Sequence, residues 1–224
     1  MNPPRPVTCR QFDESRSRPI FALIGAILLG VAITGCVTPQ RPEDLVDVEK
    51  TIPGIVLDIR YATTNNFTGQ KLYPFAKCYL RRAAAEKLHA AQREFGPLGY
   101  GLKIYDGYRP LSVQRKMWEV FPQPGYVADP KKGSRHNRGA AVDVTLLRLS
   151  DGAELPMPTP YDDFTERAHR NFKDLPDAVI RNRELLERVL TKHGFVGLLT
   201  EWWHFDDADW RNYPLLDLPV PSAR

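Results

Sequence analysis

The feature that most constrains the fold is a pair of short segments, SRHNRGAAVDV at residues 134–144 and EWWHF at residues 201–205, which are far apart in the chain. Between them they offer two imidazoles and a carboxylate, on His136, His204 and Asp143. Zinc binds such ligands readily, and a catalytic zinc site typically takes three protein ligands and leaves a fourth position for water. If the three residues share one ion, the chain around Asp143 must be a neighbour of the chain around His204.

The first segment predicts a turn followed by a strand. Residues 139–149 indicate a strand because small or polar residues alternate with valines and a leucine, which places Asp143 on the face opposite the valines. His136 stands seven positions before Asp143, so the chain must turn between them, and Gly139 tolerates backbone angles that other residues avoid. The third ligand then has to come from an adjacent strand.

The second segment pairs a carboxylate with a histidine. Glu201 lies three positions before His204, so the histidine can bind metal while the glutamate stays outside the ligand set. A carboxylate in that position can accept a proton from a water that the metal activates and pass it to the leaving amine. Trp202 and Trp203 are expected to pack around the site and limit solvent, with ordinary core packing as the alternative for at least one of them. A single histidine beside a strand is more often structural, so the hypothesis depends on the combination.

Local patterns predict an α+β fold, an antiparallel sheet with helices packed against it in a single domain. Strands are expected over residues 54–62, 101–108, 139–149 and 198–206, the last of them carrying both Glu201 and His204. Helices are expected over residues 77–95, from Pro110 to Phe121, and from a cap at Asn182 to Gly194. Cys78, inside the first helix, is interpreted as a small buried residue rather than a nucleophile.

The N-terminal residues resemble an export signal. Arg16 and Arg18 precede an uncharged run at residues 20–34, which is shorter than the ~20 residues that a membrane-spanning helix needs. The run ends in Ile-Thr-Gly-Cys at residues 33–36, which resembles the lipobox of bacterial lipoproteins, where the cysteine is lipidated. We therefore expect an exported envelope lipoprotein, periplasmic or membrane-anchored through Cys36. The alternative is a buried N-terminal helix in a cytoplasmic protein.

This interpretation divides the chain into three parts: a signal peptide at residues 1–35, an anchor and linker at residues 36–50, and a catalytic domain at residues 51–224. The linker is expected because residues 37–50 combine prolines and charges with little apolar periodicity. A hydrophobic content of 42% fits an ordinary globular core. The 31 basic and 27 acidic residues give a net charge of only +4 and are scattered, so a nucleic-acid partner is not expected.

Four segments together resemble a known family. SRHNRGAAVDVTL and EWWHF, taken with YATTNNFTG at residues 61–69 and GYGLKIYDGYRP at residues 99–110, are similar to the D-alanyl-D-alanine dipeptidases of the vancomycin-resistance type. These are zinc peptidases that share a fold with bacterial D,D-carboxypeptidases and the hedgehog signalling domain. The resemblance runs from about Ile55 to Phe205.

The resemblance implies a role for each matching residue. One Zn²⁺ ion would be held by His136, Asp143 and His204, and Glu201 would be the general base and then the general acid. Arg109 would stabilise the oxyanion of the tetrahedral intermediate, with a structural salt bridge to an acid such as Asp106 as the alternative.

The resemblance also implies a substrate site for a small D,D-dipeptide. Tyr61 and Asp162 would bind its ammonium group, and Ser134 would contact its carboxylate; Asp163 is the neighbouring alternative to Asp162. The implied reaction is hydrolysis of D-Ala-D-Ala, which in the envelope would serve cell-wall turnover and D-alanine salvage. The alternatives are a D,D-carboxypeptidase acting on longer stem peptides and a zinc-stabilised binding module without activity.

Overall fold

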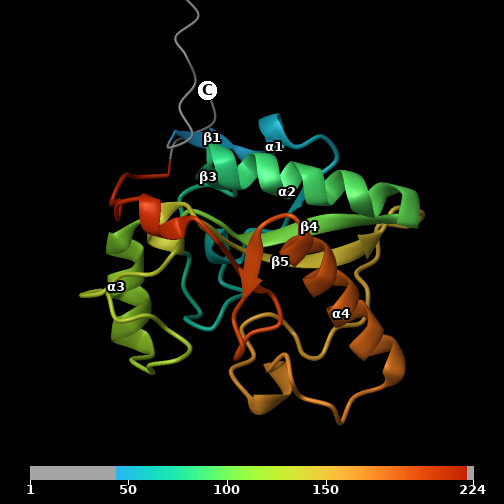
Figure 1. Ribbon diagram of the computed structural model, residues 1–224. Helices are drawn as coiled ribbons and strands as arrows, with labels where there is room; N and C mark the ends of the chain where they lie inside the picture. The colour runs from blue at the N-terminus through green and yellow to red at the C-terminus, as the bar shows by residue number, and fades with distance from the viewer. Residues whose placement is uncertain (1–43, 221–224) are drawn as a thin grey trace, which may run out of the picture. The chain divides into compact units, whose positions relative to one another are not determined.

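A five-stranded sheet in the order β2-β4-β5-β7-β6 is the centre of the part of the chain that the computed structural model describes, residues 44–220 (Figure 1). Its strands are β2 (Val56–Leu57), β4 (Tyr100–Asp106), β5 (Ala141–Arg148), β6 (Phe195–Gly197) and β7 (His204–Asp207), and a separate two-stranded sheet pairs β1 (Leu45–Asp47) with β3 (Tyr79–Arg81). The α-helices are α1 (Val48–Thr51), α2 (Arg82–Phe95), α3 (Leu111–Val120) and α4 (Asp177–Lys192). Short 3₁₀ turns are η1 (Arg60–Ala62), η2 (Gly96–Leu98), η3 (His136–Arg138), η4 (Glu166–Ala168) and η5 (Trp210–Asn212).

The central strands of the sheet run antiparallel, as predicted. β5 pairs with β4 on one side and with β7 on the other, and β7 pairs with β6, all in antiparallel register. The edge strand β2 differs, because it pairs with β4 in parallel. Between β2 and β4 the chain crosses over through β3 and α2, and such a crossover returns it in the direction from which it started.

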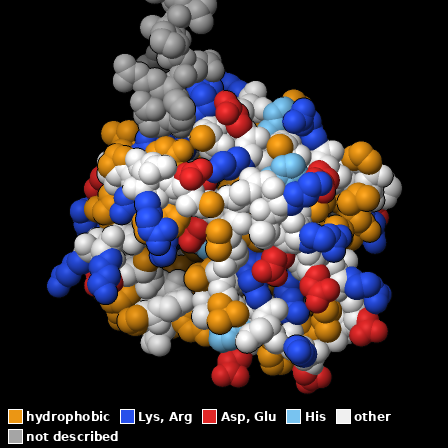
Figure 2. All heavy atoms as spheres, viewed as in Figure 1, with side chains coloured by type: hydrophobic (Ala, Val, Ile, Leu, Met, Phe, Trp, Pro, Cys, Tyr) orange, Lys and Arg blue, Asp and Glu red, His pale blue; other side chains and the backbone are white. Residues whose placement is uncertain are grey.

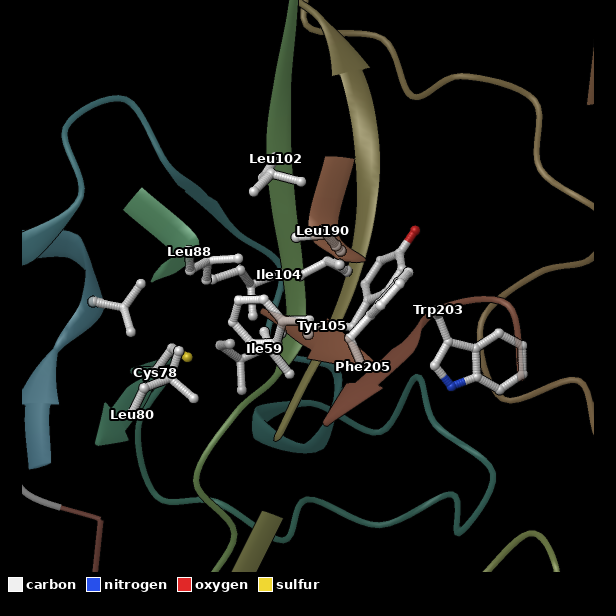
Figure 3. Packing of buried hydrophobic residues seen from close by; sticks show 14 of the residues in the cluster. Ile59, Cys78, Leu80, Leu88, Leu102, Ile104, Tyr105, Leu190, Trp203 and Phe205 are labelled. Atoms are coloured by element: carbon white, nitrogen blue, oxygen red, sulfur yellow. The ribbon is translucent and has the colours of Figure 1, made fainter. Parts of the chain in front are cut away.

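Two helices pack against the sheet and against each other. α2 contacts β4, whereas α4 contacts β5 and β6 (Figure 1). Leu88 of α2, Ile104 of β4 and Leu190 of α4 are fully buried and lie close together between these elements (Figure 3). Burying an aliphatic side chain of this size contributes about 1.5–3 kcal/mol, so this cluster fixes the helices on the sheet.

The predicted linker at residues 36–50 is wrong over the part that the structure describes. Residues 45–47 form β1, which pairs with β3, and α1 follows without a break. Val48 and Ile52 are completely buried, while Glu49 and Lys50 face solvent. The apolar pattern is only a few residues long and its anchor, β3, lies far along the chain, so local periodicity did not reveal it. The domain therefore begins before residue 51.

The predicted helix over residues 77–95 begins later, at Arg82. Residues 79–81 are extended because they pair with β1. Cys78 lies just before β3 rather than in a helix, but it is buried as expected (Figure 3). The expected cap at Asn182 is also wrong: α4 begins at Asp177, and the Asn182 side chain donates a hydrogen bond to the Pro156 carbonyl.

Two predicted strands are shorter than expected. The strand over residues 54–62 is reduced to β2, and η1 follows it. In the segment at residues 198–206 only the end is a strand, since β7 begins at His204. Glu201 therefore lies in the turn between β6 and β7 and not on the strand.

Basic and acidic side chains are interspersed on the face that Figure 2 shows. In residues 44–220 no helix combines the length and the apolar character that crossing a membrane requires. The predicted signal peptide at residues 1–35 and the predicted lipidation site at Cys36 lie outside the described residues.

Candidate active site

Strand register brings Asp143 and His204 together. They face each other as partners in the antiparallel pairing of β5 with β7, and both are buried. Directly opposed residues on antiparallel strands have their Cβ atoms about 4.5–5.5 Å apart, which suits two ligands of one ion. The predicted neighbouring strands are thus the two that carry these residues.

His136 reaches the same point from η3, the turn that precedes β5. Gly139 ends the turn with a φ of 68°, a left-handed conformation that favours glycine. A Cβ atom there would lie 2.6 Å from Leu45 Cδ2 of β1, so the turn also needs a residue without a side chain. The Gly139 carbonyl accepts a hydrogen bond from the Arg81 amide, which ties the turn to β3.

The three predicted ligand atoms are nearly equidistant. His136 Nε2 lies 3.1 Å from His204 Nδ1 and 3.3 Å from Asp143 Oδ1, and His204 Nδ1 lies 3.1 Å from Asp143 Oδ1. Ligand atoms about 2.0–2.1 Å from a tetrahedral zinc ion are separated by about 3.3 Å. The spacing therefore fits three ligands of one zinc ion, and among residues 44–220 this is the group that could hold a metal.

Hydrogen bonds outside the ligand set show which ring nitrogens face the centre with a lone pair. His136 Nδ1 lies 2.8 Å from the Gly107 carbonyl, which can only accept, so Nδ1 donates and Nε2 is left with a lone pair. His204 Nε2 likewise donates to Asp206 Oδ1 at 2.8 Å, which leaves the lone pair on Nδ1. Two lone pairs and a carboxylate oxygen therefore converge, and a cation is what makes that arrangement favourable.

The remaining oxygen of Asp143 is also held. The Tyr161 hydroxyl donates to Asp143 Oδ2 at 2.9 Å, so Oδ1 is the atom left for a metal. Burial opposes ionisation of Asp143, but the interactions with His136 and His204 outweigh it and hold the pKa of Asp143 below its usual range. Burial also lowers the pKa of His204, yet the carboxylates of Asp143 and Asp206 raise it to about 10. Both shifts show that the centre favours a positive charge, which is a proton on His204 Nδ1 in the metal-free protein and would be the metal ion when the lone pair of Nδ1 binds one.

Glu201 lies beside the three ligands without joining them. Its Oε2 is 4.0 Å from His204 Nδ1, and the residue is only 6% exposed. Burial is the main cause that raises the pKa of Glu201 to about 8, with the charges of Asp143 and Asp162 adding to it. A carboxylate that binds a proton this readily next to a metal site has the property that a general base needs.

Arg109 follows β4 and lines the same cavity. Its Nε and Nη2 donate to Asp106 Oδ2 at 3.0 and 2.7 Å, and Nη1 donates to Gln114 Oε1 at 2.9 Å. The salt bridge that sequence reasoning kept as the alternative is therefore present. It fixes the guanidinium in position, so the structural role and the oxyanion role are compatible.

Tyr61 and Asp162 meet in the same cavity. The Tyr61 hydroxyl lies 3.1 and 3.2 Å from the two carboxylate oxygens of Asp162. Asp162 has a φ of 63°, and in the described residues it alone among non-glycine residues has a positive φ. Burial and the nearby Asp143 raise the pKa of Asp162 to about 7. Asp163 instead accepts from the Thr165 amide and does not line the cavity, so the geometry favours Asp162.

Ser134 lies next to the candidate metal ligands, buried, with its Oγ accepting a hydrogen bond from the His136 amide at 3.2 Å. The cavity that all these residues share has a volume of about 230 Å³. That is below the roughly 300–1,000 Å³ of pockets that hold drug-sized ligands, so the site suits a small substrate.

The tryptophans divide as sequence reasoning allowed. Trp203 lines the cavity, whereas Trp202 is a core residue whose Nε1 donates to Thr159 Oγ1. Sequence reasoning missed Tyr161 and Asp206, which hold Asp143 and His204. The signal for Asp206 was its position two residues after His204, where alternation returns it to the same face of the strand. Tyr161 carried no signal, because it comes from a loop far from its partner.

The sequence comparisons agree with this geometry. A family model described as D-ala-D-ala dipeptidase matches residues 41–219. The D-alanyl-D-alanine dipeptidase of Escherichia coli is 40% identical over 177 residues, which cover 77% of this chain and 89% of that protein. The D-alanyl-D-alanine dipeptidase of Enterococcus faecalis is 32% identical over 199 residues, covering 79% of this chain and 93% of that protein.

Among solved structures, the D,D-dipeptidase VanXYg in complex with a D-Ala-D-Ala phosphinate analog is 17% identical, with a TM-score of 0.39 over 74% of this chain and 66% of that chain. The family model extends beyond the resemblance seen from Ile55 to Phe205 and includes β1, which agrees with the earlier start of the domain. On the match of the family model and the two curated relatives, this chain belongs to the D-Ala-D-Ala dipeptidase family of metallopeptidases.

Proposed function

We propose that the protein hydrolyses D-alanyl-D-alanine to two molecules of D-alanine with the help of one zinc ion. The observation that carries the proposal is the convergence of three ligand atoms within 3.3 Å of one another beside the buried, protonatable Glu201. Two relatives that are 40% and 32% identical are D-alanyl-D-alanine dipeptidases, which supports the same substrate here.

The donor set suits zinc because it combines two neutral imidazoles with one carboxylate. When bound, zinc would polarise the scissile carbonyl and lower the pKa of a water to about 7. His136, Asp143 and His204 would hold the ion, and the Gly107 carbonyl, Asp206 and Tyr161 would keep the ligands oriented. Metal analysis of the purified protein, before and after chelation, tests for a single zinc per chain.

Glu201 moves the proton in this proposal. Its carboxylate takes a proton from the attacking water and then gives it to the amine that leaves. The attacking oxygen therefore does not become positive and the leaving nitrogen does not become negative. Because Glu201 lies in a buried cavity, its protonated form is stable enough to exist between the two transfers. Arg109 donates to the oxygen of the substrate carbonyl as that oxygen becomes negative.

The two ends of the dipeptide are recognised by separate groups that line the same cavity as the ligands. The carboxylate of Asp162 and the Tyr61 hydroxyl accept hydrogen bonds from the ammonium group, and Ser134 donates to the substrate carboxylate. A site that binds both free ends rejects longer peptides. The cavity volume of about 230 Å³ supports this restriction.

Glu201→Gln tests the assignment of the base. The variant keeps the volume and the hydrogen-bonding atoms but cannot accept the proton, so kcat is expected to fall about 10²- to 10⁴-fold while zinc content stays the same. Glu184→Gln, which changes an exposed glutamate on α4, is the matched control. Full activity of Glu201→Gln would remove Glu201 from the mechanism.

Assays with two substrates separate the proposal from its nearest alternative. Free D-Ala-D-Ala should be cleaved, and a stem pentapeptide that ends in D-Ala-D-Ala should not. Cleavage of the pentapeptide alone would indicate a D,D-carboxypeptidase. Zinc binding without cleavage of either would indicate a binding module.

We also propose that the protein is exported and anchored in the envelope through Cys36, where it would hydrolyse dipeptide released by wall turnover. The basic and apolar residues 16–34 followed by a lipobox-like sequence support this location. Cell fractionation and mass spectrometry of the mature N-terminus test it. A cytosolic protein with residues 1–35 intact would refute the proposal, and Cys36→Ser should release the protein from the membrane.

A further inference from the structure

The proposed base lies in a turn whose closing backbone hydrogen bonds are long. Residues 198–203 connect β6 to β7 and carry Glu201, and the next residue is His204. The Leu198 amide donates to the His204 carbonyl at 3.2 Å, and the Glu201 amide donates to the Leu198 carbonyl at 3.3 Å. Both distances exceed the usual 2.9–3.0 Å for such bonds. Elsewhere in the turn the Trp203 carbonyl accepts from the Val144 amide at 3.0 Å and Thr200 Oγ1 donates to the Gly125 carbonyl at 3.1 Å, so the closure at Leu198 is the part that needs a further support.

Arg170 supplies three additional hydrogen bonds to this turn. Its backbone amide donates to the Leu199 carbonyl at 2.9 Å. Its side chain donates from Nε to the Leu198 carbonyl at 2.9 Å and from Nη2 to the His204 carbonyl at 2.7 Å. The two carbonyls that receive the side chain mark the beginning and the end of the turn, so one guanidinium clamps both.

The Leu198 carbonyl links the arginine directly to the base. It accepts from Arg170 Nε and from the Glu201 amide, so displacement of the guanidinium changes the position of the atom to which Glu201 is bonded. The charge of Arg170 also acts on Glu201, since the two side chains interact electrostatically. The connection therefore has a geometric part and an electrostatic part.

The environment of Arg170 leaves its guanidinium little freedom. The residue is 9% exposed, and its Cζ lies 4.1 Å from the centre of the Phe205 ring. On another side it contacts Gly197, where an added Cβ atom would lie 2.4 Å from the guanidinium. Nη1 faces Glu187 of α4, with its Oε2 at 3.5 Å. Burying a charged side chain is costly, and here the bonds to the turn and the ion pair with Glu187 offset the cost.

We propose that Arg170 is a positioning residue for Glu201, which holds the turn at residues 198–203 in the geometry that proton transfer requires. This inference rests on the proposed function in assigning the proton transfer to Glu201. It predicts that loss of Arg170 lowers turnover far more than metal content or substrate affinity. Arg170 touches the proposed ligand His204 only at its backbone carbonyl, whereas Asp206 holds the His204 ring and the pairing of β7 with β5 holds its backbone.

Arg170→Gln is the first test, in the zinc-loaded full chain. Glutamine retains a donor but cannot reach both carbonyls, so kcat is expected to fall about 10- to 100-fold, the size of effect that a displaced catalytic group produces. KM for D-Ala-D-Ala and zinc content should change less than about twofold. Arg170→Lys keeps the charge and one bond and should be intermediate. Added guanidinium ion should restore part of the activity of Arg170→Gln by filling the vacated space.

Arg183→Gln is the matched control. Arg183 is also a buried arginine that donates to backbone carbonyls, but its partners are His169 and Phe172 and not the turn. Its loss should lower stability but reduce kcat much less than Arg170→Gln does, at temperatures where the variant is folded, because Arg183 reaches the turn only through the backbone next to Arg170. If Arg170→Gln fails to fold, Gly197→Ala tests the same idea with Arg170 retained, because the added methyl group displaces the guanidinium.

Hydrogen exchange supplies a readout that does not depend on activity. In Arg170→Gln, the amides of residues 198–204 should exchange faster, while those of β4, which does not contact the turn through its backbone, should not change. Equal loss of kcat in the Arg170 and Arg183 variants, or unchanged exchange in the turn, would overturn the positioning role. If the wild-type protein does not cleave D-Ala-D-Ala, the proposed function fails, and the exchange data still decide whether Arg170 holds the turn.

Discussion

The two halves of the site are built differently. Asp143 and His204 are held by the register of β5 and β7, two strands that are almost entirely buried. Asp162 and Glu201 are held by loops, one with a left-handed backbone at φ 63° and the other in the turn that Arg170 clamps. The metal half therefore shares the stability of the core, whereas the substrate half depends on a few local contacts.

This difference separates the expected effects of mutation. A change in the sheet half should act on metal binding first, and activity should follow metal content. A change in the loop half should act on KM or kcat while metal content stays constant. A sheet variant that loses activity but keeps its metal, or a loop variant that loses its metal, would break the distinction between the two halves.

The largest effect is expected from Asp143→Ala in the sheet half. Removing a charged ligand leaves two imidazoles, so the zinc content should fall and kcat/KM should decrease about 10³-fold or more, because the metal contributes several kcal/mol of stabilisation to the transition state. Metal analysis and a D-Ala-D-Ala assay on the same sample measure both. Asp163→Ala is the control, since Asp163 does not line the cavity. Retention of zinc by Asp143→Ala would contradict the ligand assignment.

The contrast between the halves also explains what the sequence could predict. The grouping of His136, Asp143 and His204 was predictable because the residue types that bind zinc and the alternation of a strand can both be recognised in short segments of sequence. The neighbouring strands followed from the requirement that one ion be shared. The sequence singled out Glu201 as the candidate base but placed it on a strand, whereas it lies in a turn. The alternation of side chains gives no sign of the residue at which strand pairing begins.

Features that depend on distant pairing were not predictable. β1 and β3 form a strand pair only because residues 45–47 and 79–81 meet, and neither segment alone differs from a linker or the start of a helix. Tyr161 and Arg170 support the site from loops that carry no periodic pattern. Residues whose role comes from tertiary contacts therefore required the structure.

Asp206→Ala should have the next largest effect, again in the sheet half. Asp206 accepts the hydrogen bond that leaves the lone pair of His204 on Nδ1. Without it the ring can bind in the wrong tautomer or orientation, and zinc affinity should fall about 10- to 100-fold. Competition with a zinc chelator measures the change. Asp209→Ala removes a nearby carboxylate that is 60% exposed and should bind zinc normally. If both variants lose zinc affinity equally, Asp206 acts through its negative charge alone and not through its hydrogen bond to His204.

Asp162→Asn tests the loop half. Loss of a charge-assisted hydrogen bond to the substrate's ammonium group costs about 1.5–3 kcal/mol, so KM for D-Ala-D-Ala should rise at least about tenfold. Zinc content should not change, because Asp162 contacts Tyr61 and not a ligand. Asp163→Asn, which changes a half-buried neighbour that does not line the cavity, should have a normal KM. A loss of zinc in Asp162→Asn would mean that the two halves are not independent.

The smallest effect is a pH dependence of stability in the metal-free protein. The folded pKa of Asp162, about 7, lies above the usual 3.8, so its contribution to stability is fully present below about pH 4 and is lost as the pH rises through 7. From about pH 5 to about pH 8, the wild type should lose about 1–3 kcal/mol relative to Asp162→Asn, measured by chemical denaturation. Subtracting the variant removes the contribution of groups that titrate in both proteins. Asp143 adds to the shift through its negative charge, so a bound zinc ion should reduce the difference. An equal difference with and without zinc would show that the two halves are electrostatically separate as well as structurally distinct.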